Sequence, residues 1–159
     1  MTHDWSLESS ICRWLSAHSF TLATAESCSG GLIAHRMTNV PGASAVFRGG
    51  VVAYSNEIKE SLLGVNPSVL RDCGAVSESV ARQMAEGARR LFAADYGVGV
   101  TGIAGPSGGT AEKPVGLAFV AVAASEGTVV RRHVFSGTRE DIKNQTADMA
   151  FVLLKEVLS

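Results

Sequence analysis

The sequence lacks several features that mark specialised classes of protein. Its 14 basic and 15 acidic residues give a net charge of −1, without a strong run of either sign. Proteins that bind nucleic acid or acidic membrane surfaces usually carry a basic patch, so neither partner is expected. The three cysteines, Cys12, Cys28 and Cys73, form no CxxC pair, which argues against a disulfide framework and a zinc site. This cysteine usage fits a reducing cytoplasm.

Long apolar runs are also lacking. The longest, from Val115 to Ala124, has about half the length that a membrane-spanning helix needs, so we interpret it as a buried strand. The N-terminal segment has no basic region followed by an apolar stretch, and nothing there marks the chain for export. No internal repeat appears. No HExxH, EF-hand pattern or aspartate cluster offers ligands to a metal, so we expect neither a metal nor an organic cofactor.

What remains is the composition of an ordinary folded domain. Of its 159 residues, 46% are hydrophobic and 18% are charged. A chain of this size buries roughly two thirds of its unfolded surface in one core. We therefore expect residues 1–159 to form a single domain that needs no cofactor or disulfide for its stability.

Helical and strand patterns alternate along the chain and predict an α/β fold. The expected helices cover Asp4 to Ala17, with Asp4 as the cap, and residues 31–39, 56–64, 77–96 and 138–158. In helix 77–96 the expected apolar face consists of Val80, Met84, Ala88, Leu91 and Phe92. The expected strands cover residues 20–25, 48–55, 96–105, 115–124 and 128–136, and the last two pair antiparallel. This order predicts a three-layer αβα sandwich with a mixed sheet and helices on both faces.

The segment TLATAESCSGG, residues 21–31, lies at a turn from a strand to a helix. Ser27, Cys28 and Ser29 have two interpretations there. The first is helix capping, since serine is a favoured N-cap and glycine eases the turn. The second is nucleophilic attack on a carbonyl, with the N-terminal amides of the following helix holding the oxyanion. Cys28 is a rival nucleophile to serine, because a thiol at a helix N-terminus has a lowered pKa, although a buried structural cysteine fits equally.

A nucleophilic serine needs a base, and the four histidines are poorly placed for it in helical or strand segments. A lysine can serve instead, but with a pKa near 10.4 only about 0.04% of it is neutral at pH 7. Burial lowers the pKa of a lysine by up to about 3 to 5 units. Lys59 follows the second strand by a few residues and is the candidate; the alternative is an ordinary solvated helical lysine.

The loop from Gly102 to Gly109 is rich in glycine and follows the third strand. Its spacing matches neither GxxxxGK[ST] nor GxGxxG. It is either a flexible connection or a backbone that lies against a ligand. Ligands bind in α/β sheets at the carboxyl ends of strands, and both this loop and the Ser27 turn have that position.

Five motifs in register resemble the CinA C-terminal domain family over nearly the whole chain. They are TAESCSGG (24–31), GGVVAYSNEIK (49–59), GAVSESV (74–80), TGIAGPSGG (101–109) and EKPVG (112–116). This family includes the PncC-type amidohydrolases, which convert nicotinamide mononucleotide to nicotinate mononucleotide and ammonia in pyridine-nucleotide salvage. The resemblance implies that activity, a small nucleotide substrate and a homodimer.

The resemblance also implies roles for particular residues. Ser27 would be the nucleophile, Lys59 its base, and Tyr54 would position or assist this pair. The residues implied around the substrate are Ser29, Gly30, Gly31, Asn56, Thr101, Gly102, Gly105 and Arg139. The chain departs from the family where members often carry a basic pair, because here Lys143 is followed by Asn144. It is expected to be the stand-alone form, without the N-terminal domain of larger members.

Two other functions stay open at this point. A binding module would keep the glycine-rich cradle without turnover, although the presence of both Ser27 and Lys59 argues against it. An amidase could also act on another small amide, such as nicotinamide riboside.

Overall fold

A five-stranded sheet organises the computed structural model, which describes residues 6–159. Its strands are β1 (Leu22–Glu26), β2 (Phe47–Val52), β3 (Tyr96–Gly102), β4 (Leu117–Ala124) and β5 (Gly127–Val134). They lie in the order β2-β1-β3-β4-β5. β1 runs parallel to both β2 and β3, whereas β4 is antiparallel to β3 and β5. The sheet is therefore mixed, as predicted, and β2, β1 and β3 end at the same edge.

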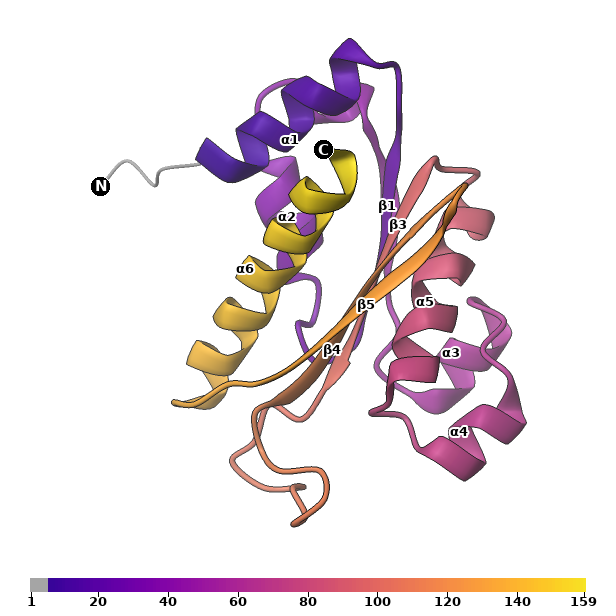
Figure 1. Cartoon of the computed structure of the whole chain (residues 1–159), viewed down its shortest axis with the longest axis vertical. Coiled ribbons are helices and arrows are strands. Elements are labelled where there is room, and N and C mark those ends of the chain that lie inside the picture. The colour runs from indigo at the N-terminus through magenta and orange to yellow at the C-terminus, as the bar shows by residue number, and fades with distance from the viewer. Residues whose placement is uncertain (1–5) are drawn as a thin grey trace.

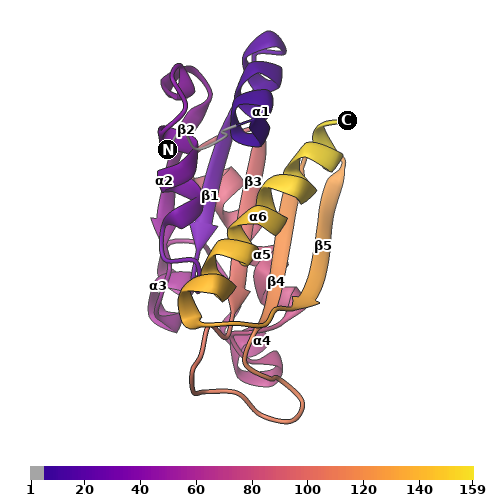
Figure 2. The same ribbon diagram turned by 90° about the vertical axis from the view of Figure 1, so that its left-hand side faces the viewer.

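Helices cover both faces of this sheet. Those on one face are α1 (Ser6–Ala17), α2 (Leu32–Thr38) and α6 (Arg139–Leu158), which stand in front of the strands in Figure 2. Those on the other are α3 (Asn56–Ser61), α4 (Pro67–Cys73) and α5 (Glu78–Leu91), and Figure 1 shows the two groups separated by the sheet. The predicted three-layer sandwich in one domain is thus confirmed.

Glycine and valine alternate in β3, so the strand presents valine side chains to one face of the sheet and glycines to the other. Val98 and Val100 are fully buried in the core cluster that contains side chains of α1 and α6. Gly97 and Gly99 face α5, where a Cβ at Gly99 would overlap backbone atoms of Ala81 and Ala85. The backbone of α5 therefore packs directly on β3, which only a strand without side chains on that face allows.

Most predicted elements are present with ends shifted by up to three residues, and two segments differ more. Helix α4 was not predicted, although Asn66 caps it by accepting a hydrogen bond from the Ser68 amide and Pro67 occupies its first turn. Helix α5 ends at Leu91 and not at residue 96, because the Tyr96 amide donates to the carbonyl of Thr21 and draws the chain into the sheet. Leu91 is 48% exposed and lies outside the buried face, where Val80, Met84 and Ala88 are fully buried.

Two further expectations concern the cap of the first helix and the lack of a membrane-spanning helix. The proposed cap Asp4 lies outside the described residues. Within residues 6–159, none of the helices is both long enough and apolar enough to cross a membrane.

The direct packing of α5 on β3 gives a test of the fold. Replacing Gly99 with alanine should lower the free energy of unfolding by about 1 to 3 kcal/mol, because the added Cβ has no space against α5. Urea unfolding followed by circular dichroism measures this change. Ser61→Ala at an exposed position is the control and should stay within about 0.5 kcal/mol of wild type. Equal stability of Gly99→Ala and wild type would contradict the packing.

Candidate active site

The ends of three parallel strands form the candidate site. Ser27 directly follows β1, and its amide donates to the carbonyl of Val100 in β3 at 3.0 Å. The amide of Ala53, after β2, donates to the carbonyl of Glu26 at 2.8 Å. Backbone pairing thus continues past the strands and holds these ends together. A cleft of about 310 Å³ opens at this edge.

Lys59 reaches into this cleft from α3. The helix begins where the Ser55 side chain accepts a hydrogen bond from the Ile58 amide, which places Lys59 one turn into the helix. Its side chain is fully buried, with 1% of the residue exposed. The Nζ atom lies 3.1 Å from Ser27 Oγ, 2.8 Å from the carbonyl oxygen of Ala53 and 3.4 Å from that of Tyr54. The solvated-lysine alternative is therefore wrong.

The surroundings of Lys59 favour its neutral form. Within residues 6–159 no carboxylate forms an ion pair with it. Burial lowers the pKa of the Lys59 amine below its ordinary value of 10.5. The structure thus supplies the condition that a lysine base requires, an amine removed from water and from negative charge.

Glu26 fixes the turn that carries Ser27, and the sequence analysis did not identify it. Its buried carboxylate accepts hydrogen bonds from the amides of Gly31, Ile33 and Ala34, at 3.1, 3.0 and 2.8 Å. The N-terminal amides of α2 are therefore occupied and do not hold an oxyanion, contrary to the expectation. The available signal was an acidic residue just before a helix start, where a negative charge is favourable.

Other amides of the same turn remain available. The Gly30 amide donates to the carbonyl of Ser27 at 3.1 Å. Among residues 6–159, the amides of Cys28 and Ser29 donate to no backbone carbonyl, and both act to lower the pKa of the Cys28 thiol against the larger effect of burial. They follow the nucleophile directly, so they are the donors of this turn that can meet a developing negative charge.

Cys28 is a buried thiol in an unfavourable place for a nucleophile. Burial raises its pKa to about 12, which keeps it protonated at neutral pH. The expectation that a helix N-terminus lowers the pKa of this thiol is wrong here. Burial has the largest effect on the pKa, and the carboxylate of Glu26 accepts the hydrogen bonds of the helix amides.

The remaining predicted residues fall into two groups. Ser27, Lys59, Tyr54, Asn56, Thr101, Gly102, Gly105 and Arg139 line the same cleft. Ser29, Gly30 and Gly31 line a neighbouring pocket instead, and Arg139 also lines that pocket. The predicted set is thus divided over two adjoining cavities that share one arginine.

Tyr54, Arg139 and Gly105 form a bridge across the mouth of the cleft. The Arg139 guanidinium donates to the Gly105 carbonyl at 2.6 Å and to the Tyr54 hydroxyl at 2.9 Å. The Tyr54 side chain therefore contacts Arg139, while its backbone carbonyl contacts Lys59. The Thr101 hydroxyl donates to the carbonyl of Ala75 at 2.8 Å, which ties β3 to the loop before α5.

In the part of the chain from residue 6 onward, no three side chains of the metal-ligating types lie together.

Comparisons with known proteins agree with this architecture. A family model described as the CinA C-terminal domain matches residues 4–158. A CinA-like protein of Geotalea uraniireducens is 52% identical over 139 residues, which are 87% of this chain and 33% of that protein. A CinA-like protein of Thermotoga neapolitana is 48% identical over 156 residues, which are 98% of this chain and 38% of that protein. The chain thus spans less than two fifths of the curated relatives that it matches.

A solved structure shares the fold over almost its full length. The competence/damage inducible protein CihA from Agrobacterium tumefaciens has a TM-score of 0.92 and 40% sequence identity to this chain. The match covers 98% of this chain and 95% of that one.

The lowered pKa of Lys59 makes stability depend on pH. Between the folded pKa and 10.5 the unfolded chain binds more protons than the folded one, so the free energy of unfolding rises with pH. Lys59→Met lacks this contribution. Subtracting its free energies of unfolding from those of wild type cancels the titrating groups that do not interact with Lys59. Urea unfolding from neutral to alkaline pH should therefore show wild type gaining stability relative to Lys59→Met. Parallel curves would mean that the amine is not shifted.

Proposed function

Because the chain belongs to the CinA C-terminal domain family and holds a buried serine–lysine pair, we propose that it is an amidohydrolase acting on nicotinamide mononucleotide. The products are nicotinate mononucleotide and ammonia, as in pyridine-nucleotide salvage. The observation that carries the proposal is the 3.1 Å contact between Lys59 Nζ and Ser27 Oγ in a buried site without a carboxylate partner.

The hydrogen bonds of Lys59 explain how it would act as a base. A neutral amine has two hydrogens and one lone pair. The carbonyl oxygens of Ala53 and Tyr54 accept the two hydrogens. In the proposed mechanism the lone pair faces the Ser27 hydroxyl, whose oxygen lies 3.1 Å from Nζ, and the hydroxyl donates its proton to the amine. The two carbonyls thus orient the amine for proton transfer.

The reaction proceeds through an acyl-enzyme. Ser27 Oγ bonds to the carboxamide carbon while its proton passes to Lys59 Nζ. The amides of Cys28 and Ser29 are the donors proposed for the oxyanion. The C–N bond breaks, and protonated Lys59 delivers the proton to the departing ammonia. Neutral Lys59 then takes a proton from water, the hydroxide attacks the ester, and the proton returns to Ser27 as the carboxylic acid is released. The acid then loses its own proton to solvent and becomes the carboxylate.

The positively charged pyridinium of the substrate suits this site. It withdraws electrons from the carboxamide and makes the carbon more electrophilic. A cation beside Lys59 also disfavours the charged form of the amine, which helps keep the base neutral while substrate is bound. The bridge of Arg139, Tyr54 and Gly105 holds the mouth of the cleft around the ligand.

We also propose that the protein is cytoplasmic and forms a homodimer. The free cysteines Cys12, Cys28 and Cys73 suit a reducing cytoplasm. That the protein acts as a homodimer stays a prediction.

Substitution of the two candidate nucleophiles tests the proposed function. Ammonia release from nicotinamide mononucleotide should fall at least about 10³-fold in Ser27→Ala, because the attacking oxygen is removed. In Cys28→Ala the rate should stay within about tenfold of wild type, since the thiol only fills space. An enzyme-coupled ammonia assay on purified proteins measures both. Loss in Cys28→Ala with activity kept in Ser27→Ala would overturn the nucleophile.

The pH dependence of the reaction tests the base. Only neutral Lys59 accepts a proton, so kcat/KM should rise from neutral to alkaline pH, with an apparent pKa below 10.5. Lys59→Met should abolish turnover, whereas the exposed Lys155→Met should keep the wild-type profile. A rate that falls over this range would contradict a lysine base.

A further inference from the structure

Two of the sequence motifs, GAVSESV (74–80) and EKPVG (112–116), have no role in the reaction proposed above, yet the structure brings them together. The first begins where α4 ends, and the second belongs to the loop 103–116 that joins β3 to β4. The Lys113 amine donates to the carbonyl of Cys73, the last residue of α4, at 2.6 Å. This bond joins residues 40 positions apart, so the two motifs meet at one lysine.

The loop 103–116 forms one wall of the cleft. Its lining residues are Ile103, Ala104, Gly105, Ser107 and Gly108. Figure 1 shows the loop projecting beyond the lower end of the sheet. Residues 106–112 are all exposed, so burial of side chains does not hold this part of the loop in place. Its position therefore depends on a few fixed contacts.

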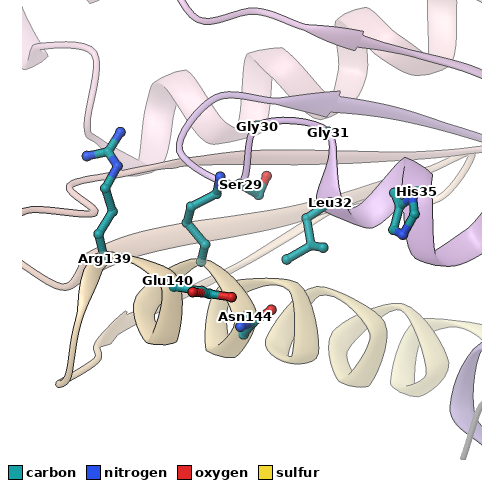
Figure 3. Close-up of a pocket in the computed structure, with 9 residues that line it drawn as sticks. Ser29, Gly30, Gly31, Leu32, His35, Arg139, Glu140 and Asn144 are labelled. Carbon is teal, nitrogen blue, oxygen red and sulfur yellow. The ribbon is translucent and has the colours of Figure 1, made fainter. Parts of the chain in front are cut away.

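Two cations supply those contacts from outside or across the loop. Arg139, which projects from the first turn of α6 in Figure 3, donates to the Gly105 carbonyl at 2.6 Å near the start of the loop. Lys113 makes its bond to Cys73 near the end of the loop. Within residues 6–159, no other side-chain hydrogen bond joins the loop 103–116 to the remainder of the protein. The loop is thus held at two points.

The end of α4 is a favourable place for the Lys113 amine. The last carbonyls of a helix have no partner within the helix and carry partial negative charge, which suits a lysine. Gly74 follows with a φ of 77°, and a Cβ there would lie 3.0 Å from Lys113 Nζ. Glycine therefore permits the left-handed turn and leaves room for the amine. Lys113 is accordingly half-buried, whereas the loop residues just before it are exposed.

The chain that follows α4 is another wall of the same cleft. Ala75 and Val76 line it, and the Ala75 carbonyl accepts the hydrogen bond of the Thr101 hydroxyl. Cys73 lies only two residues before Ala75. The bond from Lys113 to Cys73 therefore ties the loop wall to this second wall and limits how far the two can separate.

We propose that Lys113 is a positioning residue that holds the loop 103–116 against the end of α4, so that Ser107 and Gly108 enclose the substrate. Lys113 does not itself line the cleft and acts through these loop residues. This inference rests on the proposed amidohydrolase function. Without the bond, the loop must be ordered when the substrate binds, and that cost in free energy weakens binding.

Kinetics of matched variants test the role in binding. In Lys113→Met the KM for nicotinamide mononucleotide should rise at least about fivefold, with kcat within about twofold of wild type. The pH dependence of kcat/KM should keep its apparent pKa, because Lys59 and Ser27 are untouched. Lys113→Arg keeps a cationic donor and should restore much of the affinity. Asn66→Ala removes the N-cap of α4 at its other end and should leave the KM unchanged.

Hydrogen exchange tests the positioning of the loop without any substrate. The amides of Ile103, Thr110 and Gly116 donate to carbonyls within or beside the loop. In Lys113→Met they should exchange at least about tenfold faster than in wild type, because the loop opens more often. Amides of β1 and α5 should exchange as in wild type, which shows that the fold is intact.

Three outcomes would overturn the inference. Unchanged exchange of the loop amides would mean that Lys113 does not hold the loop. Faster exchange in α4 with an unchanged KM would mean that Lys113 only caps this helix. A fall in kcat with an unchanged KM would place its effect on the chemistry. If wild type does not hydrolyse nicotinamide mononucleotide, the proposed function fails, whereas the exchange rates still decide whether Lys113 positions the loop.

Discussion

A buried amine beside a serine hydroxyl is the feature on which the rest of the site depends. Burial of Lys59, without a carboxylate partner among residues 6–159, lowers the pKa of its amine, and the carbonyl oxygens of two residues accept hydrogen bonds from Nζ. Those carbonyls, of Ala53 and Tyr54, belong to the segment after β2, and Ser27 belongs to the turn after β1. The sheet must therefore place the ends of two neighbouring parallel strands together before any chemistry is available.

Small residues and one carboxylate make that placement rigid. Gly97 and Gly99 let α5 pack directly on β3, and β3 in turn receives the Ser27 amide. Glu26 binds the first amides of α2 and so fixes the turn from the opposite side. Within the turn from Ser27 to Gly31, the amides of Cys28 and Ser29 are the ones that donate to neither a carbonyl nor a carboxylate. The hydrogen bonds of Glu26 thus determine which amides of the turn are left without a backbone or carboxylate acceptor.

The sequence was sufficient for what depends on local pattern. The strand-to-helix turn located Ser27, and the short distance from the second strand located Lys59, because parallel strands end at one edge. It was insufficient for contacts between distant segments. The bond from Arg139 to Tyr54 joins residues 85 positions apart, and no spacing rule predicts it. The thiol of Cys28 was misjudged because local position suggested a helix terminus, whereas burial, a property of the whole fold, controls its pKa.

The central claim is that burial lowers the pKa of Lys59 so that its neutral form can act as the base, and the titration of this amine tests the claim most directly. Carbon-13 labelling of the lysine side chains, with Lys59→Met to assign the Cε signal, would give the pKa of this amine by nuclear magnetic resonance. A signal that titrates clearly below 10.5 agrees with the account. A Lys59 amine that titrates at or above that value would remain charged at neutral pH and contradict its role as the base for Ser27.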